Sequence, residues 1–265
     1  MSSLIPDRGR SLELLRDTEQ RFCALLRAVE DPKRTAIGKW DTGTVATHVS
    51  HVFRMYPSIA YGTPAPIADH LKLSEWWDKM LAEDSERDSS RVAERIQGYT
   101  DEFFDAITRA EWTGPVTWYG GLKLPAYVLP SLLMNECEIH GLDIAGAENR
   151  AWQIPREQAV VILLGTLPLL PHFLNRDVAK DVDATWQLKL RGGPPAFVSV
   201  RDGKLSVAER APGPVDCTIS ADPATYLLVG YGRRSQWPAL LKGQVLAYGR
   251  KPWLGLKFAR LFHSV

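Results

Sequence analysis

The hydrophobic pattern of the chain changes its period near Asp177, and this change constrains the fold more than any other feature. Before Asp177, apolar residues recur every three or four positions, as they do from Leu12 to Val29, which predicts amphipathic helices. Three further long helices are expected, at about residues 42–56, 90–109 and 125–145. Four long helices connected in this way favour an antiparallel bundle.

The residues after Asp177 alternate between apolar and polar types, which is typical of strands. Strands are expected from Thr185 to Leu190 and in the stretches after it, with a hairpin-turn signal at Arg201-Asp202-Gly203-Lys204. We therefore predict an α+β fold. Its N-terminal four-helix bundle would span residues 1–176, including an apolar helix near 156–175. A smaller α+β domain with an antiparallel sheet would span residues 177–265.

Charge and composition narrow the classes of partner. The 265 residues include 32 Lys and Arg and 31 Asp and Glu, and this balance argues against a broad nucleic-acid surface. The longest apolar run, 159–174, is interrupted by prolines and is too short for a membrane span. The first ten residues lack the apolar core of a signal peptide. We expect a cytoplasmic protein that has neither a nucleic acid nor a membrane as a partner.

Three cysteines are scattered through the chain, and none forms a CxxC pair with another. This spacing excludes a zinc ribbon and a thioredoxin-like motif. Three reduced thiols are expected, and the setting of Cys23 in an apolar helical run favours a place in the core.

Ionisable residues stand within the last predicted long helix, where most neighbours are apolar. Glu136 and His140 are four residues apart, so they share one helix face and one ion could bind both. This spacing alone is weak evidence, because such pairs also occur on solvated surfaces. Buried ionisable groups, however, are costly unless they are paired or bound to a metal. His48 or His51 from another helix would supply a third ligand, which leaves coordination positions open, as in catalytic zinc sites.

Several segments resemble a known family, the mycothiol-dependent maleylpyruvate isomerases of actinobacteria. Trp40 with His48, and Glu136 with His140-Gly141-Leu142-Asp143, resemble the signature of the DinB-like superfamily to which its helical half belongs. Segments of the second half resemble its sterol-carrier-like domain, namely Ile219-Ser220-Ala221-Asp222-Pro223, Tyr231-Gly232-Arg233, Trp237-Pro238 and Tyr248-Gly249-Arg250-Lys251-Pro252-Trp253. The resemblance maps the three metal ligands of the family onto His48, Glu136 and His140, and it leaves His51 outside the set.

The resemblance implies a divalent metal, most simply zinc, and mycothiol as co-substrate. The implied reaction is cis–trans isomerisation by thiolate addition and elimination. The alternatives are a mycothiol S-transferase acting on an electrophile and a non-catalytic carrier of a small molecule or lipid. Arg233 and its neighbour Arg234 are candidate partners for a substrate carboxylate, since a guanidinium suits that group, and the alternative is that both are solvated surface residues. Asp143 would orient His140 or else cap the helix.

Overall fold

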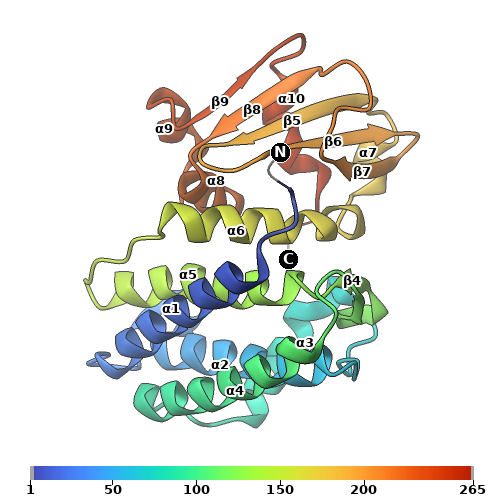
Figure 1. Cartoon of the computed structure of the whole chain (residues 1–265). Coiled ribbons are helices and arrows are strands. Elements are labelled where there is room, and N and C mark those ends of the chain that lie inside the picture. The colour runs from blue at the N-terminus through green and yellow to red at the C-terminus, as the bar shows by residue number, and fades with distance from the viewer. Residues whose placement is uncertain (1–2, 264–265) are drawn as a thin grey trace. The chain divides into compact units, whose positions relative to one another are not determined.

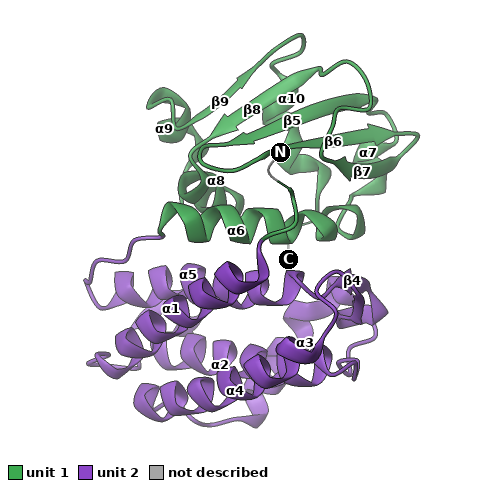
Figure 2. Ribbon diagram, viewed as in Figure 1, with its two compact units in different colours: residues 1–6, 155–264 green, residues 7–154, 265 purple. Residues whose placement is uncertain are grey.

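The computed structural model describes residues 3–263, which form two compact units (Figure 2). One unit contains residues 7–154, and the other contains residues 3–6 and 155–263. The apolar helix α6 (Arg156–Thr166) therefore belongs to the second unit, whereas the sequence placed it with the first and set the boundary near residue 176. The reason is physical: an apolar helix must be buried, but its composition does not say against which partner.

Four long helices make up most of the first unit (Figure 1): α1 (Arg8–Arg27), α2 (Thr42–Ala60), α4 (Ser89–Arg109) and α5 (Val128–Ala147). Helices α1 and α2 each pack against both α4 and α5. The side chains between them are large and apolar, and Phe22, Phe53, Phe103 and Leu129 are fully buried. This common core fixes the distance between α2 and α5, the two helices that carry the predicted site.

Aspartates begin three of these helices. The side chain of Asp7 accepts a hydrogen bond from the backbone N–H of Arg10. In the same way, Asp41 accepts one from Thr44. Asp88 accepts two, from Ser90 and Arg91. Such caps satisfy backbone N–H groups that a helix leaves without partners in its first turn. Each aspartate therefore fixes the residue at which its helix begins.

Shorter elements complete the first unit, and the sequence pattern predicted none of them. They are β1 (Thr35–Ile37), β2 (Trp40–Asp41), η1 (His70–Lys72), α3 (Leu73–Glu83), β3 (Pro115–Thr117), η2 (Tyr119–Gly121) and β4 (Lys123–Pro125). Strands β1 and β2 form one antiparallel pair, and β3 and β4 form another. The β1–β2 pair ends directly at α2, and β3–β4 precedes α5, so both hairpins lie beside the helices of the site.

The second unit is built on a mixed five-stranded sheet, in the order β7-β6-β5-β8-β9. The strands are β5 (Ala184–Leu190), β6 (Pro195–Arg201), β7 (Lys204–Ala208), β8 (Cys217–Ala221) and β9 (Val245–Tyr248). The predicted α+β class is confirmed, but the sheet is not wholly antiparallel, because β8 runs parallel to β5. Alternation of apolar and polar residues reports which face of a sheet a side chain occupies, and it carries no information on strand direction.

One face of this sheet carries the core of the second unit. Trp186 and Leu188 of β5 and Ile219 of β8 pack there with Val160 of α6 and Phe258 of α10 (Leu254–Phe258). The remaining elements of this unit are η3 (Leu167–His172), α7 (Arg176–Ala179), α8 (Pro223–Gly230), α9 (Gln236–Leu241) and η4 (Ala259–Leu261). Across residues 3–263, no helix is long and apolar enough to cross a membrane.

A close contact at Gly141 packs α5 against the segment that follows it. A Cβ atom at this position would lie 2.5 Å from the ring of Trp152. That ring is held in place, because its Nε1 donates to Glu138 at 2.9 Å and the guanidinium of Arg21 lies 4.6 Å from the ring centroid. The absence of a side chain at Gly141 therefore allows the Trp152 ring to pack directly on the backbone of α5, next to His140.

We expect Gly141→Ala to lower the free energy of unfolding by about 1–3 kcal/mol, because the methyl group would force Trp152 out of its position. Gly146→Ala on the same helix is the matched control, since its added Cβ would contact none of the described residues apart from its own helix. The control should be neutral or stabilising by up to about 1 kcal/mol, because alanine favours helix more than glycine does. Urea unfolding followed by circular dichroism measures both, and equal stabilities would contradict the packing described.

Candidate metal centre

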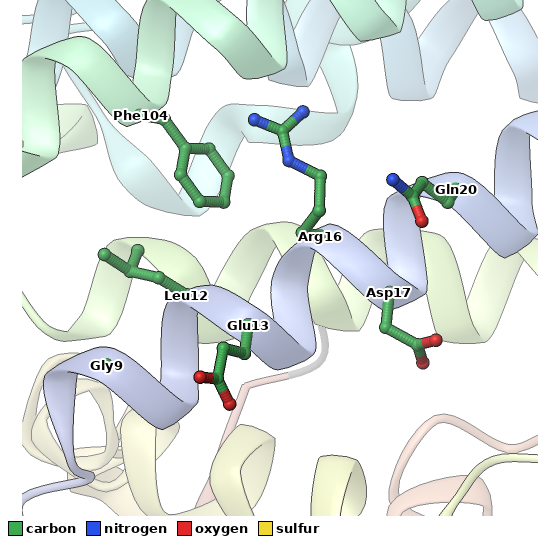
Figure 3. Close-up of a pocket in the computed structure, with 7 residues that line it drawn as sticks. All are labelled: Gly9, Leu12, Glu13, Arg16, Asp17, Gln20 and Phe104. Atoms are coloured by element: carbon green, nitrogen blue, oxygen red, sulfur yellow. The ribbon is translucent and has the colours of Figure 1, made fainter.

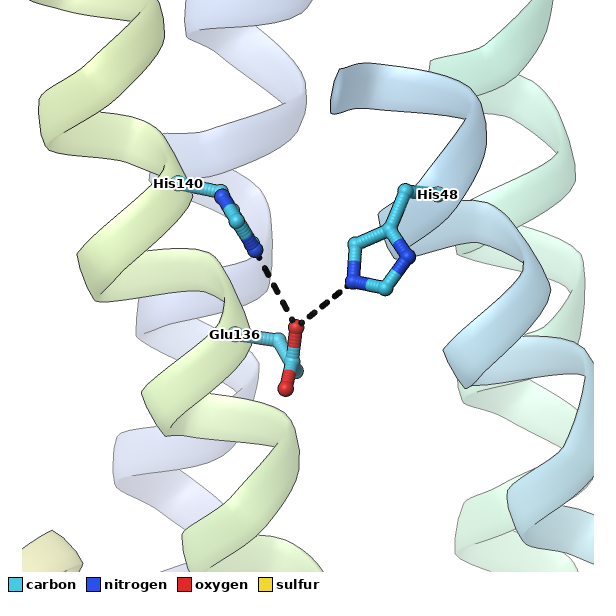
Figure 4. Close-up of side chains that lie close together, drawn as sticks. All are labelled: His48, Glu136 and His140. Atoms are coloured by element: carbon cyan, nitrogen blue, oxygen red, sulfur yellow. Dashed lines mark ion pairs between the residues drawn. The ribbon is translucent and has the colours of Figure 1, made fainter. Parts of the chain in front are cut away.

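Side chains from α2 and α5 converge at one point within the first unit (Figure 4). Oε2 of Glu136 lies 3.4 Å from Nε2 of His48 and 3.5 Å from Nε2 of His140. One ligand atom from each of the three residues lies within 4.8 Å of the other two. The carboxylate therefore stands between two imidazoles, which is the arrangement expected of groups that share one cation.

The three side chains differ in how far they are buried. The His48 side chain is 8% exposed and that of His140 13% exposed, whereas Glu136 keeps 24% of its side chain accessible. Burial lowers the pKa of His48, and the neighbouring Glu136 carboxylate only partly opposes this effect. His48 is therefore neutral at physiological pH, which is the protonation state in which an imidazole binds a metal.

Two indole rings pack against His48. The ring of Trp40 lies 5.1 Å from that of His48, and the ring of Trp77, from α3, lies 5.0 Å away and nearly perpendicular. These indoles fix the orientation of the imidazole and keep water from it. Trp40 immediately precedes Asp41, the residue that caps α2, so the start of the helix also positions one wall of the site.

The residues present fit a divalent metal. Two imidazole nitrogens and one carboxylate oxygen are the ligand types of many catalytic zinc sites, and three protein ligands leave room for an exogenous group. The same set also suits iron, nickel or cobalt, so the donor atoms alone do not identify the ion.

Asp143 contacts His140 through the ring nitrogen that faces away from Glu136. Its Oδ2 lies 3.1 Å from Nδ1 of His140, one turn along α5. A carboxylate in this position holds the imidazole in the tautomer that leaves Nε2 available to a metal. Of the two possibilities left open by the sequence, this geometry favours orientation of His140, because α5 continues past Asp143 to Ala147.

His51, the other candidate for the third ligand, takes part in a different interaction. Its Nε2 lies 3.3 Å from Oδ2 of Asp84, and the same carboxylate oxygen accepts a hydrogen bond from Arg95 at 2.9 Å. His51 therefore belongs to a separate, partly buried cluster with Asp84 and Arg95, and it does not join the group around Glu136.

Arg233, the predicted partner of a substrate carboxylate, lies in the second unit. Its guanidinium donates to the backbone oxygen of Tyr231 at 3.0 Å. Within that unit the contact restrains the side chain, and its role in substrate binding stays a prediction.

A shallow groove on α1 is lined by Gly9, Leu12, Glu13, Arg16, Asp17, Gln20 and, from α4, Phe104 (Figure 3). The guanidinium of Arg16 lies 4.3 Å from the Phe104 ring centroid and pairs with Asp101 at 2.8 Å. None of the predicted site residues lines this groove, and its charged groups already have partners within the unit.

Comparisons with known proteins support the fold. Residues 169–262 match the model of the SCP-2 sterol transfer family. The crystal structure of a mycothiol-dependent maleylpyruvate isomerase is 15% identical, covers 93% of this chain and 95% of its own, and has a TM-score of 0.55. A variant of that isomerase with one histidine replaced by alanine gives the same values.

A ubiquinone synthesis protein, UbiJ-SCP2, is 17% identical over 41% of this chain and 93% of its own, with a TM-score of 0.32. A search of curated protein sequences found no match. At these identities the similarity to the isomerase shows a shared fold over nearly the whole length of both chains.

The cluster around His51 predicts a pH dependence of stability. Burial lowers the pKa of His51 to about 4, with Arg54 acting in the same direction and Asp84 against it. The unfolded side chain titrates near 6.5, so between these two values the unfolded chain binds a proton that the folded chain does not. The stabilising effect of a neutral His51 is present above pH 6.5 and is lost as the pH falls toward 4.

We expect this loss to be on the order of 2 kcal/mol at pH 5, and His51→Gln should remove most of it. The free energy of unfolding, measured in urea at pH 7 and pH 5 for both proteins, gives the difference. Buried His48 also contributes to the pH dependence of stability in both proteins. Only the difference between the wild type and the variant is therefore assigned to His51. An unchanged pH dependence in the variant would show that His51 takes up its proton over the same pH range in the folded and the unfolded protein.

Proposed function

We propose that this chain is a metal-dependent enzyme that uses a low-molecular-weight thiol, mycothiol, as its nucleophile, of the maleylpyruvate isomerase type. The observation that carries the proposal is the convergence of His48, Glu136 and His140 from two helices. The fold shared with a mycothiol-dependent maleylpyruvate isomerase supports it. In this proposal the helices of the first unit form a DinB-like four-helix bundle, and the protein works in the cytoplasm.

The residues of the chain have separable tasks in this function. His48, Glu136 and His140 would hold the ion, most simply zinc, and Asp143 would fix the tautomer of His140. Trp40 and Trp77 limit the access of water to His48. Direct coordination of a thiol to a divalent cation favours its deprotonated form, which is the chemistry that the bound metal supplies.

An external thiol is needed because the chain's own cysteines are unsuited to attack. Cys23, Cys137 and Cys217 are buried and unpaired with one another. Burial raises the pKa of each of these thiols above its ordinary value. Since the thiolate is the reactive form, none of the three would act as a nucleophile at neutral pH.

In the isomerisation, the thiolate sulfur bonds to one carbon of the cis double bond, and the electron pair of that bond moves onto the conjugated carbonyl oxygen. The resulting single bond rotates. The electron pair then returns, the carbon–sulfur bond breaks, and the thiolate leaves unchanged. No thiol is consumed, which separates this reaction from an S-transfer.

A second candidate function is a non-catalytic carrier of a small molecule or lipid. The match of residues 169–262 to the SCP-2 sterol transfer family favours it. A carrier of this kind would not use His48, Glu136 or His140. Substitution of His140 would therefore abolish the proposed enzyme activity but would leave binding of the carried molecule unchanged.

The metal site can be tested by elemental analysis of the purified protein, for which we expect about one equivalent of a divalent metal. His140→Ala should lose it, since two ligands make a poor site. Asp143→Ala should lower the affinity about 10- to 100-fold. His51→Gln is the matched control and should keep the metal, because His51 pairs with Asp84. A His140→Ala variant with undiminished metal would overturn the ligand assignment.

The reaction can be tested by incubating the metal-loaded protein with mycothiol and maleylpyruvate. We expect fumarylpyruvate to form while the thiol concentration stays constant. A steady loss of thiol with formation of an adduct would indicate an S-transferase instead. Neither change, together with lipid that co-purifies with the protein, would indicate a carrier. Absorbance of the product and a thiol assay distinguish these outcomes in one sample.

A further inference from the structure

The hydroxyl of Tyr119 is a buried polar group that has no hydrogen-bond partner among the described residues. The residue is only 2% exposed. Its neighbour Tyr56 is equally buried, but the hydroxyl of Tyr56 accepts a hydrogen bond from Nε1 of Trp118 at 3.2 Å. A buried hydroxyl without a partner destabilises a fold, so its presence calls for a ligand or a water molecule that supplies the missing contact.

Tyr119 lies in the same aromatic enclosure as the candidate metal centre. Its ring is 6.1 Å from that of Trp77 and nearly perpendicular to it, and Trp77 in turn contacts His48. Burial raises the pKa of Tyr119 well above its ordinary value, and the nearby Glu136 carboxylate acts in the same direction. The hydroxyl thus keeps its proton at neutral pH and senses the carboxylate at the centre of the site.

The backbone around Tyr119 holds it in a defined position. Gly120 has a φ of +66° and its N–H donates to the oxygen of Ile67 at 2.9 Å. A Cβ atom on Gly120 would lie 2.7 Å from the backbone nitrogen of His70, so only glycine allows this approach. The turn is closed by a hydrogen bond from Trp118 to Leu122 at 2.7 Å. A side chain anchored in this way is preorganised.

We propose that Tyr119 is a catalytic residue that donates a hydrogen bond to the carbonyl oxygen of the bound electrophile. This inference rests on the proposed function. When the thiolate adds to the conjugated double bond, negative charge develops on that oxygen, and a fixed phenol in a site with little water stabilises it. The hydroxyl keeps its proton throughout, because the charge returns to sulfur on elimination. The substrate class is therefore an α,β-unsaturated carbonyl compound.

Tyr119→Phe tests this role, with Tyr56→Phe as the matched control. We expect Tyr119→Phe to keep the metal content and the stability of the ligand-free protein, because its hydroxyl bonds to no described residue. Its kcat for maleylpyruvate with mycothiol should fall about 100-fold with little change in KM. Tyr56→Phe should be less stable, because it leaves Nε1 of Trp118 without its acceptor, and should keep most of its kcat.

Three results would overturn the inference. A Tyr119→Phe variant whose kcat is within twofold of the wild type would show that the hydroxyl does not contact the reacting oxygen. A loss of stability as large as that of Tyr56→Phe would show that a structural water holds it. A wild-type protein that binds metal but transforms neither substrate would remove the proposed function and this inference together, whereas the first two results leave the proposed function intact.

Discussion

Packing of α2 and α5 against α1 and α4 is the constraint on which the candidate metal centre depends, because it places a carboxylate between two imidazoles in the first unit. Burial of ionisable groups is unfavourable unless they are paired, hydrogen-bonded or bound to a cation. Glu136 meets His48 and His140 only because α2 and α5 both pack against α1 and α4 at fixed separations. The cap at Asp41 and the close contact at Gly141 then fix the ends and the register of the helices that carry them.

Local spacing was enough to predict which ionisable side chains share one face of α5. Glu136 and His140 share a face because they are four residues apart, and Asp143 follows one turn later on the same side. The hairpin at Arg201–Lys204 was predictable for a similar reason, since Asp202 and Gly203 both adopt the positive φ that such a turn requires. In each case the residues in contact are only a few positions apart in the sequence.

Contacts between residues that are far apart in the sequence could not be predicted from local spacing. The placement of β8 beside β5, the burial of α6 in the second unit, and the approach of Trp77 to His48 all depend on packing between distant segments. The choice between His48 and His51 is another example. Both histidines are buried on α2, and their spacing did not separate them. The family resemblance selected His48, which lies against Glu136, whereas His51 lies against Asp84. Tyr119 carried no sequence signal beyond being one of many aromatic residues.

The burial of all three cysteines has a consequence for a protein that would handle reactive electrophiles. An accessible, low-pKa thiol would be alkylated by such compounds or would form mixed disulfides with a small thiol co-substrate. Cys137 lies next to Glu136 in the sequence, yet it points into the core, where burial raises its pKa well above the ordinary value. In a chain with the proposed function, burial of the cysteines would therefore protect the protein against inactivation by its own substrates.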